Sequence, residues 1–86
     1  MPELSRFYGI VIKMHFDDHS PPHFHAEYGG DQAIINIETL GLIEGQLRPR
    51  ALGLVMEGSA VHQEALRTAW LKAKNLERPE QFAPLP

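Results

Sequence analysis

The stretch His23–Thr39, "HFHAEYGGDQAIINIET", decides the predicted fold because two alternating runs flank a glycine turn. Apolar and polar side chains alternate over residues 23–28 and again over 33–39, and a period of two residues is typical of half-buried β-strands. Between the runs, Gly29 and Gly30 can adopt the positive backbone angles that a tight hairpin requires. The stretch therefore predicts two antiparallel strands that share one apolar face.

A further strand is predicted before this hairpin. Residues 7–16, "FYGIVIKMHF", alternate in the same way, with Lys13 and His15 on the polar face. Residues 17–22, "DDHSPP", are rich in turn-forming residues and predict a loop longer than a two-residue hairpin. Residues 41–45 could add a short fourth strand or form only a turn. We therefore expect a small antiparallel sheet of three or four strands.

The second half of the chain predicts one long helix. Pro49 suits a first helical turn, and apolar residues then recur at steps of three and four to about residue 75. Such a helix would measure about 40 Å, so it must bend or extend beyond the sheet, with Gly53 and Gly58 as its weak points. His62 lies on the apolar stripe and is predicted to be a buried core histidine.

These elements predict the α+β class, with the sheet packed against one long C-terminal helix. A length of 86 residues allows a single core, which we assign to residues 1–77. Residues 78–86, "RPEQFAPLP", contain three prolines and predict an extended tail, whose Phe82 and Leu85 could dock on the body or on a neighbour.

Composition excludes several classes of protein. The chain has no cysteine, so disulfides and thiolate metal sites are excluded. Its formal net charge of −3 argues against a general polyanion binder. No apolar run approaches the roughly 20 residues that a membrane helix needs, and the first residues lack the pattern of a signal peptide. We expect a cytoplasmic protein without membrane contact.

The most distinctive feature is a cluster of histidines. His23 and His25 lie two residues apart on a predicted strand, so their rings point the same way at a spacing of about 6.5 Å. His19 precedes them in the loop, and His15 lies on the neighbouring strand. All four are candidate metal ligands, and imidazoles suit zinc or another divalent transition metal.

Two other interpretations of the cluster stay open. His19, His23 and His25 are also candidate catalytic residues, either around a metal-activated water or as a metal-free acid and base acting on a phosphodiester. Asp18 or Glu27 could assist them. Alternatively, the histidines form a polar patch that meets only solvent or a partner.

A second candidate site involves basic residues. Arg48 and Arg50 flank Pro49 at the predicted helix start, where they could bind phosphate of RNA or DNA, or an acidic partner surface. Lys13 extends this site if the fold brings it there. The alternative is that both arginines reach into solvent or pair with acidic residues of the same chain.

The motif Asp18-His19-x-Pro21-Pro22-His23-Phe24-His25, supported by Met1-Pro2, Gly9-Ile10 and Arg50-Ala51-Leu52, resembles the bacterial domain-of-unknown-function family 4160. The resemblance extends from Met1 to about Glu77. Many members are encoded beside another small domain, in an arrangement similar to a toxin-antitoxin pair. The resemblance therefore implies a component that binds a protein encoded nearby, with RNA as a further contact. A homodimer through the helix or tail is a further expectation.

Overall fold

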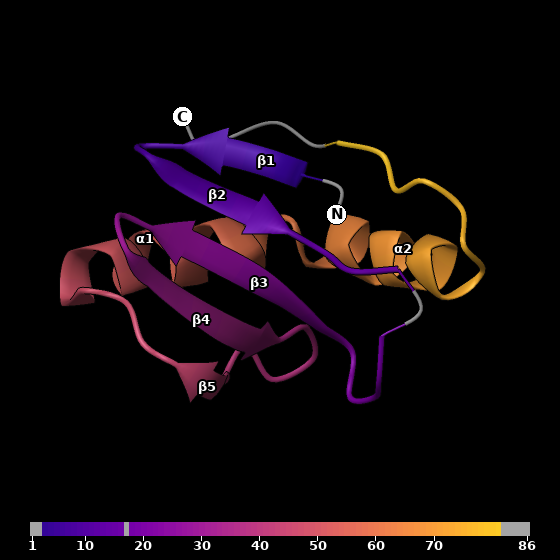
Figure 1. Ribbon diagram of the computed structural model, residues 1–86, viewed down its shortest axis with the longest axis horizontal. Helices are drawn as coiled ribbons and strands as arrows, with labels where there is room; N and C mark the ends of the chain where they lie inside the picture. The colour runs from indigo at the N-terminus through magenta and orange to yellow at the C-terminus, as the bar shows by residue number, and fades with distance from the viewer. Residues whose placement is uncertain (1–2, 17, 82–86) are drawn as a thin grey trace.

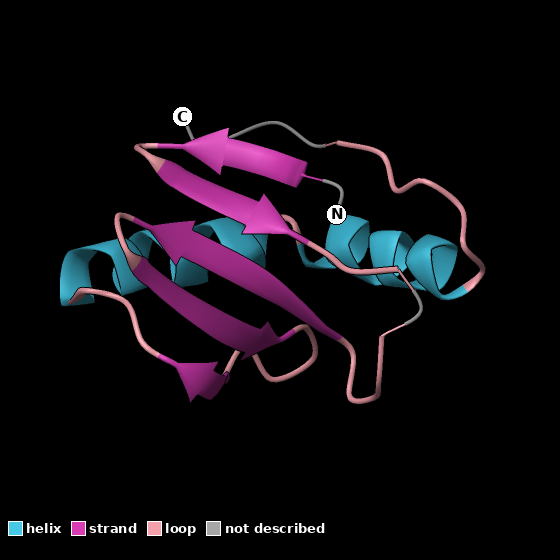
Figure 2. Ribbon diagram, viewed as in Figure 1, coloured by secondary structure: helices cyan, strands magenta, loops and turns pink. Residues whose placement is uncertain are grey.

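The computed structural model describes residues 3–16 and 18–81, which form one antiparallel sheet with two helices on one of its faces (Figures 1 and 2). The five strands are β1 (Glu3–Phe7), β2 (Ile10–Lys13), β3 (His23–Tyr28), β4 (Asp31–Asn36) and β5 (Leu42–Gly45), and neighbours in sequence are neighbours in the sheet. The helices are α1 (Pro49–Val61) and α2 (Gln63–Lys74). The predicted α+β class and the predicted hairpin of β3 and β4 are confirmed.

The predicted strand over residues 7–16 is too long, because the chain turns back at Tyr8 and Gly9 and only residues 10–13 of it form β2. Both residues have positive φ angles, 51° and 79°, so that Phe7 pairs with Ile10 and β1 with β2. The sequence concealed β1 because an irregularity between Glu3 and Ser5 breaks its alternation. Residues 42–45 also form a strand, so the sheet has five strands where we expected three or four.

The prediction of one long helix is also wrong. Helix α1 ends at Val61 and α2 begins at Gln63, with the break at His62 and not at the predicted weak points Gly53 and Gly58. A straight helix over residues 49–74 would measure about 39 Å, whereas the longest dimension of the backbone is 33 Å. The break keeps both apolar faces on the sheet and leaves His62 half-buried, so its predicted burial in the core is corrected.

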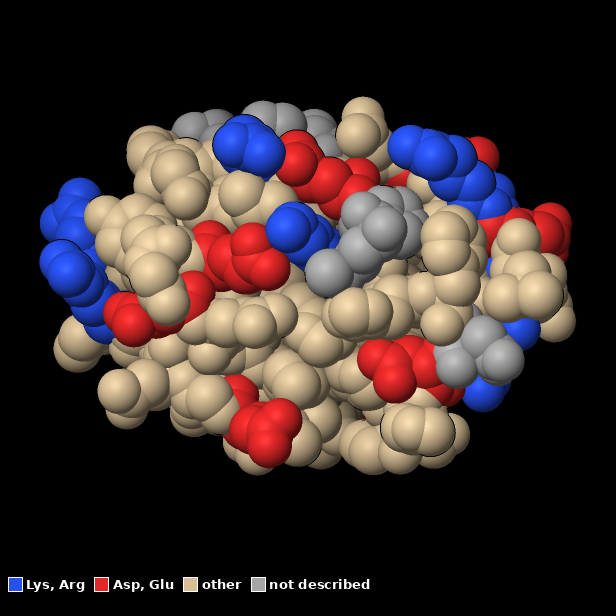
Figure 3. All heavy atoms as spheres, viewed as in Figure 1, with Lys and Arg blue, Asp and Glu red and all other residues tan. Residues whose placement is uncertain are grey.

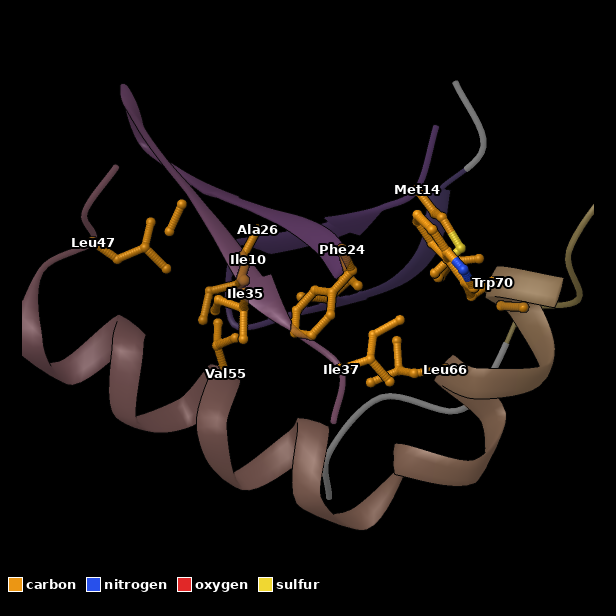
Figure 4. Packing of buried hydrophobic residues seen from close by; sticks show 14 of the residues in the cluster. Ile10, Met14, Phe24, Ala26, Ile35, Ile37, Leu47, Val55, Leu66 and Trp70 are labelled. Atoms are coloured by element: carbon orange, nitrogen blue, oxygen red, sulfur yellow. The ribbon is translucent and has the colours of Figure 1, made fainter. Parts of the chain in front are cut away.

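The core lies between the sheet and the two helices (Figure 4). Phe24 of β3 is fully buried there, together with Ile10, Ile35, Val55 and Leu66. Because side chains alternate along a strand, His23 and His25 project from the opposite side of β3 to Phe24. The histidines therefore lie mostly outside this apolar layer, although His23 meets its edge at Trp70 of α2.

The described part of the tail packs against the body. Residues 78–81 have no regular secondary structure, yet Pro79 is buried and the Gln81 side chain donates a hydrogen bond to the Glu3 carbonyl at 3.3 Å. The predicted docking of Phe82 and Leu85 lies outside the described residues. Within the described part of the chain, no helix is both long enough and apolar enough to span a bilayer.

Candidate metal centre

The centre is built from β3 and the loop that enters it. His23 and His25 start β3, and Asp18 lies in the loop between β2 and β3. The backbone carbonyl of Asp18 accepts a hydrogen bond from Lys74 Nζ at 3.1 Å, which ties the loop to the end of α2. The three side chains are thus held in place by the loop between β2 and β3 and by helix α2, which is distant in sequence.

His23 is oriented by contacts on both ring nitrogens. Nδ1 lies 2.7 Å from the Pro21 carbonyl, and Nε2 lies 2.9 Å from Asp18 Oδ2. A carbonyl can only accept, so Nδ1 donates and Nε2 is the nitrogen presented to Asp18. The Trp70 ring of α2 packs beside the imidazole, with 5.2 Å between ring centroids. A histidine that binds a metal through one ring nitrogen commonly donates its other N–H to a backbone carbonyl in this way.

His25 is buried, but one of its nitrogens lacks a partner. The side chain is only 9% exposed, and Nε2 makes no hydrogen bond to any described residue. Nδ1 lies 3.3 Å from the Gln32 amide nitrogen, and Nε2 lies 3.8 Å from Asp18 Oδ2. The ring packs against His15, with centroids 4.2 Å apart. The free nitrogen is therefore aimed toward the carboxylate without bonding to it.

Electrostatics favour the unprotonated forms of two of these groups. Burial lowers the pKa of His25, and the neighbouring His15 and His23 lower it further. Burial alone would raise the pKa of Asp18, but the hydrogen bond from the His19 backbone N–H and the interaction with the His23 ring outweigh it and hold this pKa below its usual range. Near neutral pH the site therefore offers a carboxylate and a neutral imidazole, the forms that bind metals.

Asp18, His23 and His25 each offer a ligand atom, and these atoms all lie within 4.8 Å of one another. Donors bound to one zinc at about 2.0–2.2 Å lie roughly 3–3.5 Å apart, so small side-chain shifts would bring the three onto one ion. Two imidazoles and one carboxylate leave coordination positions open for water or substrate.

The open side of the centre faces a hollow of about 350 Å³. Ile34 of β4 and Ile43 of β5 provide an apolar wall, while the loop residues His19 and Pro21 form part of the rest. A ligand in this hollow would touch apolar side chains and the three donor groups at once.

The remaining predicted site residues take different places. His19 is exposed and lines the hollow, outside the group of three ligand atoms, and His15 packs on His25 without joining that group. Glu27 pairs with Lys13 at 3.0 Å and does not belong to the group of three ligand atoms. Arg48 and Arg50 lie beside a separate hollow, which Lys13 does not line.

The sequence did not reveal the supporting residues Gln32, Trp70 and Lys74. They come from β4 and α2, and no spacing relates them to the histidine motif. The sequence signal that relates Trp70 to Lys74 is their spacing of four residues, which places both on one face of α2.

The family model described as Domain of unknown function (DUF4160) matches residues 9–71, most of the chain. The chain belongs to this family. The region matched by DUF4160 includes Asp18, His23, His25 and Trp70. Neither the comparison with curated proteins nor that with solved structures gave a match.

Proposed function

We propose that Asp18, His23 and His25 bind one divalent transition metal, zinc before others, and that the protein is a small metal-dependent hydrolase. The observation that carries this proposal is the buried Nε2 of His25, which has no hydrogen-bond partner among the described residues. Leaving a buried polar atom unsatisfied typically costs about 1–3 kcal/mol. A metal ion shared with Asp18 and His23 would remove that penalty.

A simple ion pair between His23 and Asp18 is the competing explanation. It accounts for the 2.9 Å contact but leaves His25 without a role, because its Nε2 is too far from Asp18 Oδ2 for a hydrogen bond. It also gives no reason to bury a second imidazole beside the first. The metal explanation uses all three groups.

The residues around the centre suit hydrolysis. A zinc held by three protein ligands keeps an open position and lowers the pKa of a bound water to about 7. The exposed His19 imidazole lines the same hollow and could pass a proton to a leaving group. Ile34 and Ile43 would hold an apolar part of the substrate.

Zinc titration of the untagged protein by calorimetry tests the centre. We expect about one zinc per chain, and we expect His25→Ala and Asp18→Asn each to weaken binding at least about tenfold, or about 1.4 kcal/mol. His19→Ala is the matched control, because it removes an exposed imidazole of the same loop and should bind zinc as the wild type does. No uptake, or equal uptake by His25→Ala, would reject the metal centre.

Hydrolysis is tested with a nitrophenyl ester and a bis-nitrophenyl phosphodiester. Activity should require added zinc, disappear with a chelator, and fall in His19→Ala although that variant still binds zinc. Activity that survives the chelator but not His23→Ala would instead support the metal-free acid and base. Absence of turnover on both substrates with zinc bound would leave a binding protein rather than a hydrolase.

As a second candidate function, we propose that the chain binds a protein encoded nearby, as a component of a toxin-antitoxin-like pair. Strand β5 favours this, because it is an edge strand of the sheet and leaves Leu42 and Ile43 45% and 47% exposed. An exposed edge with apolar side chains can pair with another chain. Ile43 also lines the hollow of the metal centre, so such a partner would cover it.

Co-expression with the neighbouring gene product tests this second candidate. We expect a complex that survives purification and is lost in Ile43→Lys, whereas Val61→Lys, an equally drastic change at an exposed position of α1, should keep it. Absence of a complex with the wild type would remove the proposal. The cytoplasmic location, RNA contact and a homodimer stay predictions.

A further inference from the structure

A second hollow, of about 410 Å³, lies at the opposite end of β3 from the metal centre. Tyr28, the last residue of β3, lines it, whereas His23 and His25 begin that strand. The β1–β2 turn and the start of α1 complete its wall. The lining residues are Tyr8, Ile10, Tyr28, Arg48, Arg50, Ala51 and Leu54. Nothing in the proposed metal chemistry uses this site.

The backbone conformation of Tyr8 is energetically unfavourable for a tyrosine. It is the first residue of the two-residue turn between β1 and β2, with φ at 51°, and its side chain is 60% exposed. This left-handed conformation favours glycine, asparagine or aspartate and is unusual for a bulky residue. Backbone strain of this kind is concentrated at functional sites. The ring meets Phe7 edge to face, with 6.4 Å between centroids, but it stays largely exposed and lines the hollow.

Tyr28 brings a second aromatic ring to the same hollow. A Cβ atom built on Gly9 would lie 3.4 Å from Tyr28 Cε1, an ordinary van der Waals distance, so the Tyr28 ring lies against the turn. Tyr28 therefore holds the turn that carries Tyr8, and both rings line one cavity. Two tyrosines at a cavity wall suit a flat aromatic ligand.

Arg48 and Arg50 supply positive charge that no carboxylate among the described residues neutralises in an ion pair. Both are exposed, and neither pairs with a described carboxylate, although Arg6 and Arg67 both do, at 2.8 and 2.9 Å. Figure 3 shows basic side chains gathered at the end of the molecule where α1 begins. In a protein with a net charge of −3, two guanidinium groups that line one hollow and have no carboxylate partner among the described residues are therefore a local exception. Two guanidinium groups at one site favour phosphate, because they can bind its oxygens through several N–H groups.

We propose that this hollow binds a nucleotide, with its phosphate on Arg48 and Arg50 and its base against Tyr8 and Tyr28. The cavity volume lies near the lower end of the range of about 300–1,000 Å³ for small-molecule sites, which suits one nucleotide. The acidic chain disfavours a long polyanion, because affinity for long nucleic acids comes from many basic contacts. The recognised unit is thus a single base with its phosphate.

Titration of ¹⁵N-labelled protein with adenosine monophosphate tests the proposal. We expect chemical-shift changes centred on Tyr8, Tyr28, Ala51 and the two arginines. Adenosine alone and inorganic phosphate alone should each bind at least about tenfold more weakly, because each leaves half of the site unused. Phenyl phosphate as tight as adenosine monophosphate would overturn base recognition. No shifts in this hollow at millimolar nucleotide would overturn the proposal altogether.

Two variants separate binding from folding. The double variant Arg48→Gln with Arg50→Gln should lose at least about tenfold in affinity, whereas Arg78→Gln, which removes an exposed arginine from the tail, should bind normally. Tyr8→Asn should weaken binding several-fold while the protein stays folded, because asparagine suits the left-handed turn. Wild-type affinity in both site variants would reject the assignment.

A 5′-phosphorylated trinucleotide distinguishes the source of the nucleotide. Affinity at least about tenfold above that of the monophosphate would identify the end of an RNA strand as the occupant, and equal affinity a free nucleotide. A trinucleotide that binds without shifting Tyr8 or Tyr28 would contact another surface and contradict the proposal.

Discussion

At one end of β3, His23 and His25 are buried beneath a loop and against other rings, whereas at the other end Tyr28 lies beside an exposed turn that carries Tyr8. The first end buries two polar imidazoles, and the second leaves the Tyr8 ring largely exposed on a residue whose backbone is strained. Each departs from the arrangement that stability alone favours. The two departures differ in how strongly the rest of the fold supports them, and this difference can be measured.

The histidine end depends on the core, so the largest loss should come from Trp70→Ala. Trp70 is 6% exposed and packs on His23, and tryptophan truncation in a core typically costs about 3–5 kcal/mol of unfolding free energy. Leu71→Ala, at the next and 65% exposed position, should change it by less than about 0.5 kcal/mol. Urea denaturation measures both. Equal effects would show that the histidine end is not anchored by the core.

Zinc should stabilise this end selectively. A ligand that binds only the folded chain adds about 2.7 kcal/mol at 100 times its dissociation constant. The wild type should therefore unfold at higher urea with zinc than without, while His25→Ala should not respond. Identical shifts in both proteins would mean that zinc binds elsewhere.

Acid should destabilise the histidine end before the rest. The pKa of His25 is lowered in the folded chain, so below about pH 6.5 the unfolded chain binds a proton that the folded chain does not. The unfolding free energy should fall with decreasing pH, by at most about 1.4 kcal/mol per pH unit for this group. Asp18, whose pKa is also lowered, adds a second loss below its ordinary pKa near 4. Zinc-free His25→Gln should lack the first loss, as measured by urea titrations between pH 8 and 5.

The tyrosine end should respond least and in the opposite direction. Tyr8→Asn relieves a left-handed conformation that costs a bulky residue about 1 kcal/mol, so the unfolding free energy should rise by up to that amount. Thermal denaturation measures the change, with Tyr28→Phe as a control that keeps the ring against Gly9. A clear loss of stability in Tyr8→Asn would show that the ring is a structural contact after all.

The predictions from sequence succeeded where the structural signal is local in the chain. The β3–β4 hairpin follows from local alternation and Gly29-Gly30, and the structure confirms it. The turn at Tyr8 was missed because tyrosine is not a turn residue and fits the apolar alternation. The helix break at His62 could not be predicted, because no local sequence signal marks it. The break instead lets α1 and α2 both lie on a sheet of limited length.

The histidine motif and its neighbour Asp18 are readable in the sequence, because ligands separated by few residues on a strand and its loop must lie near each other. The burial of His23 and His25, the unsatisfied nitrogen, and the anchoring by Trp70 and Lys74 were decided only by the tertiary structure. Alternation assigned these imidazoles to a face of the strand, but what covers a face depends on segments distant in the chain. The sequence therefore determined the class of fold and the donor groups, and the packing of α2 and the loop decided their environment.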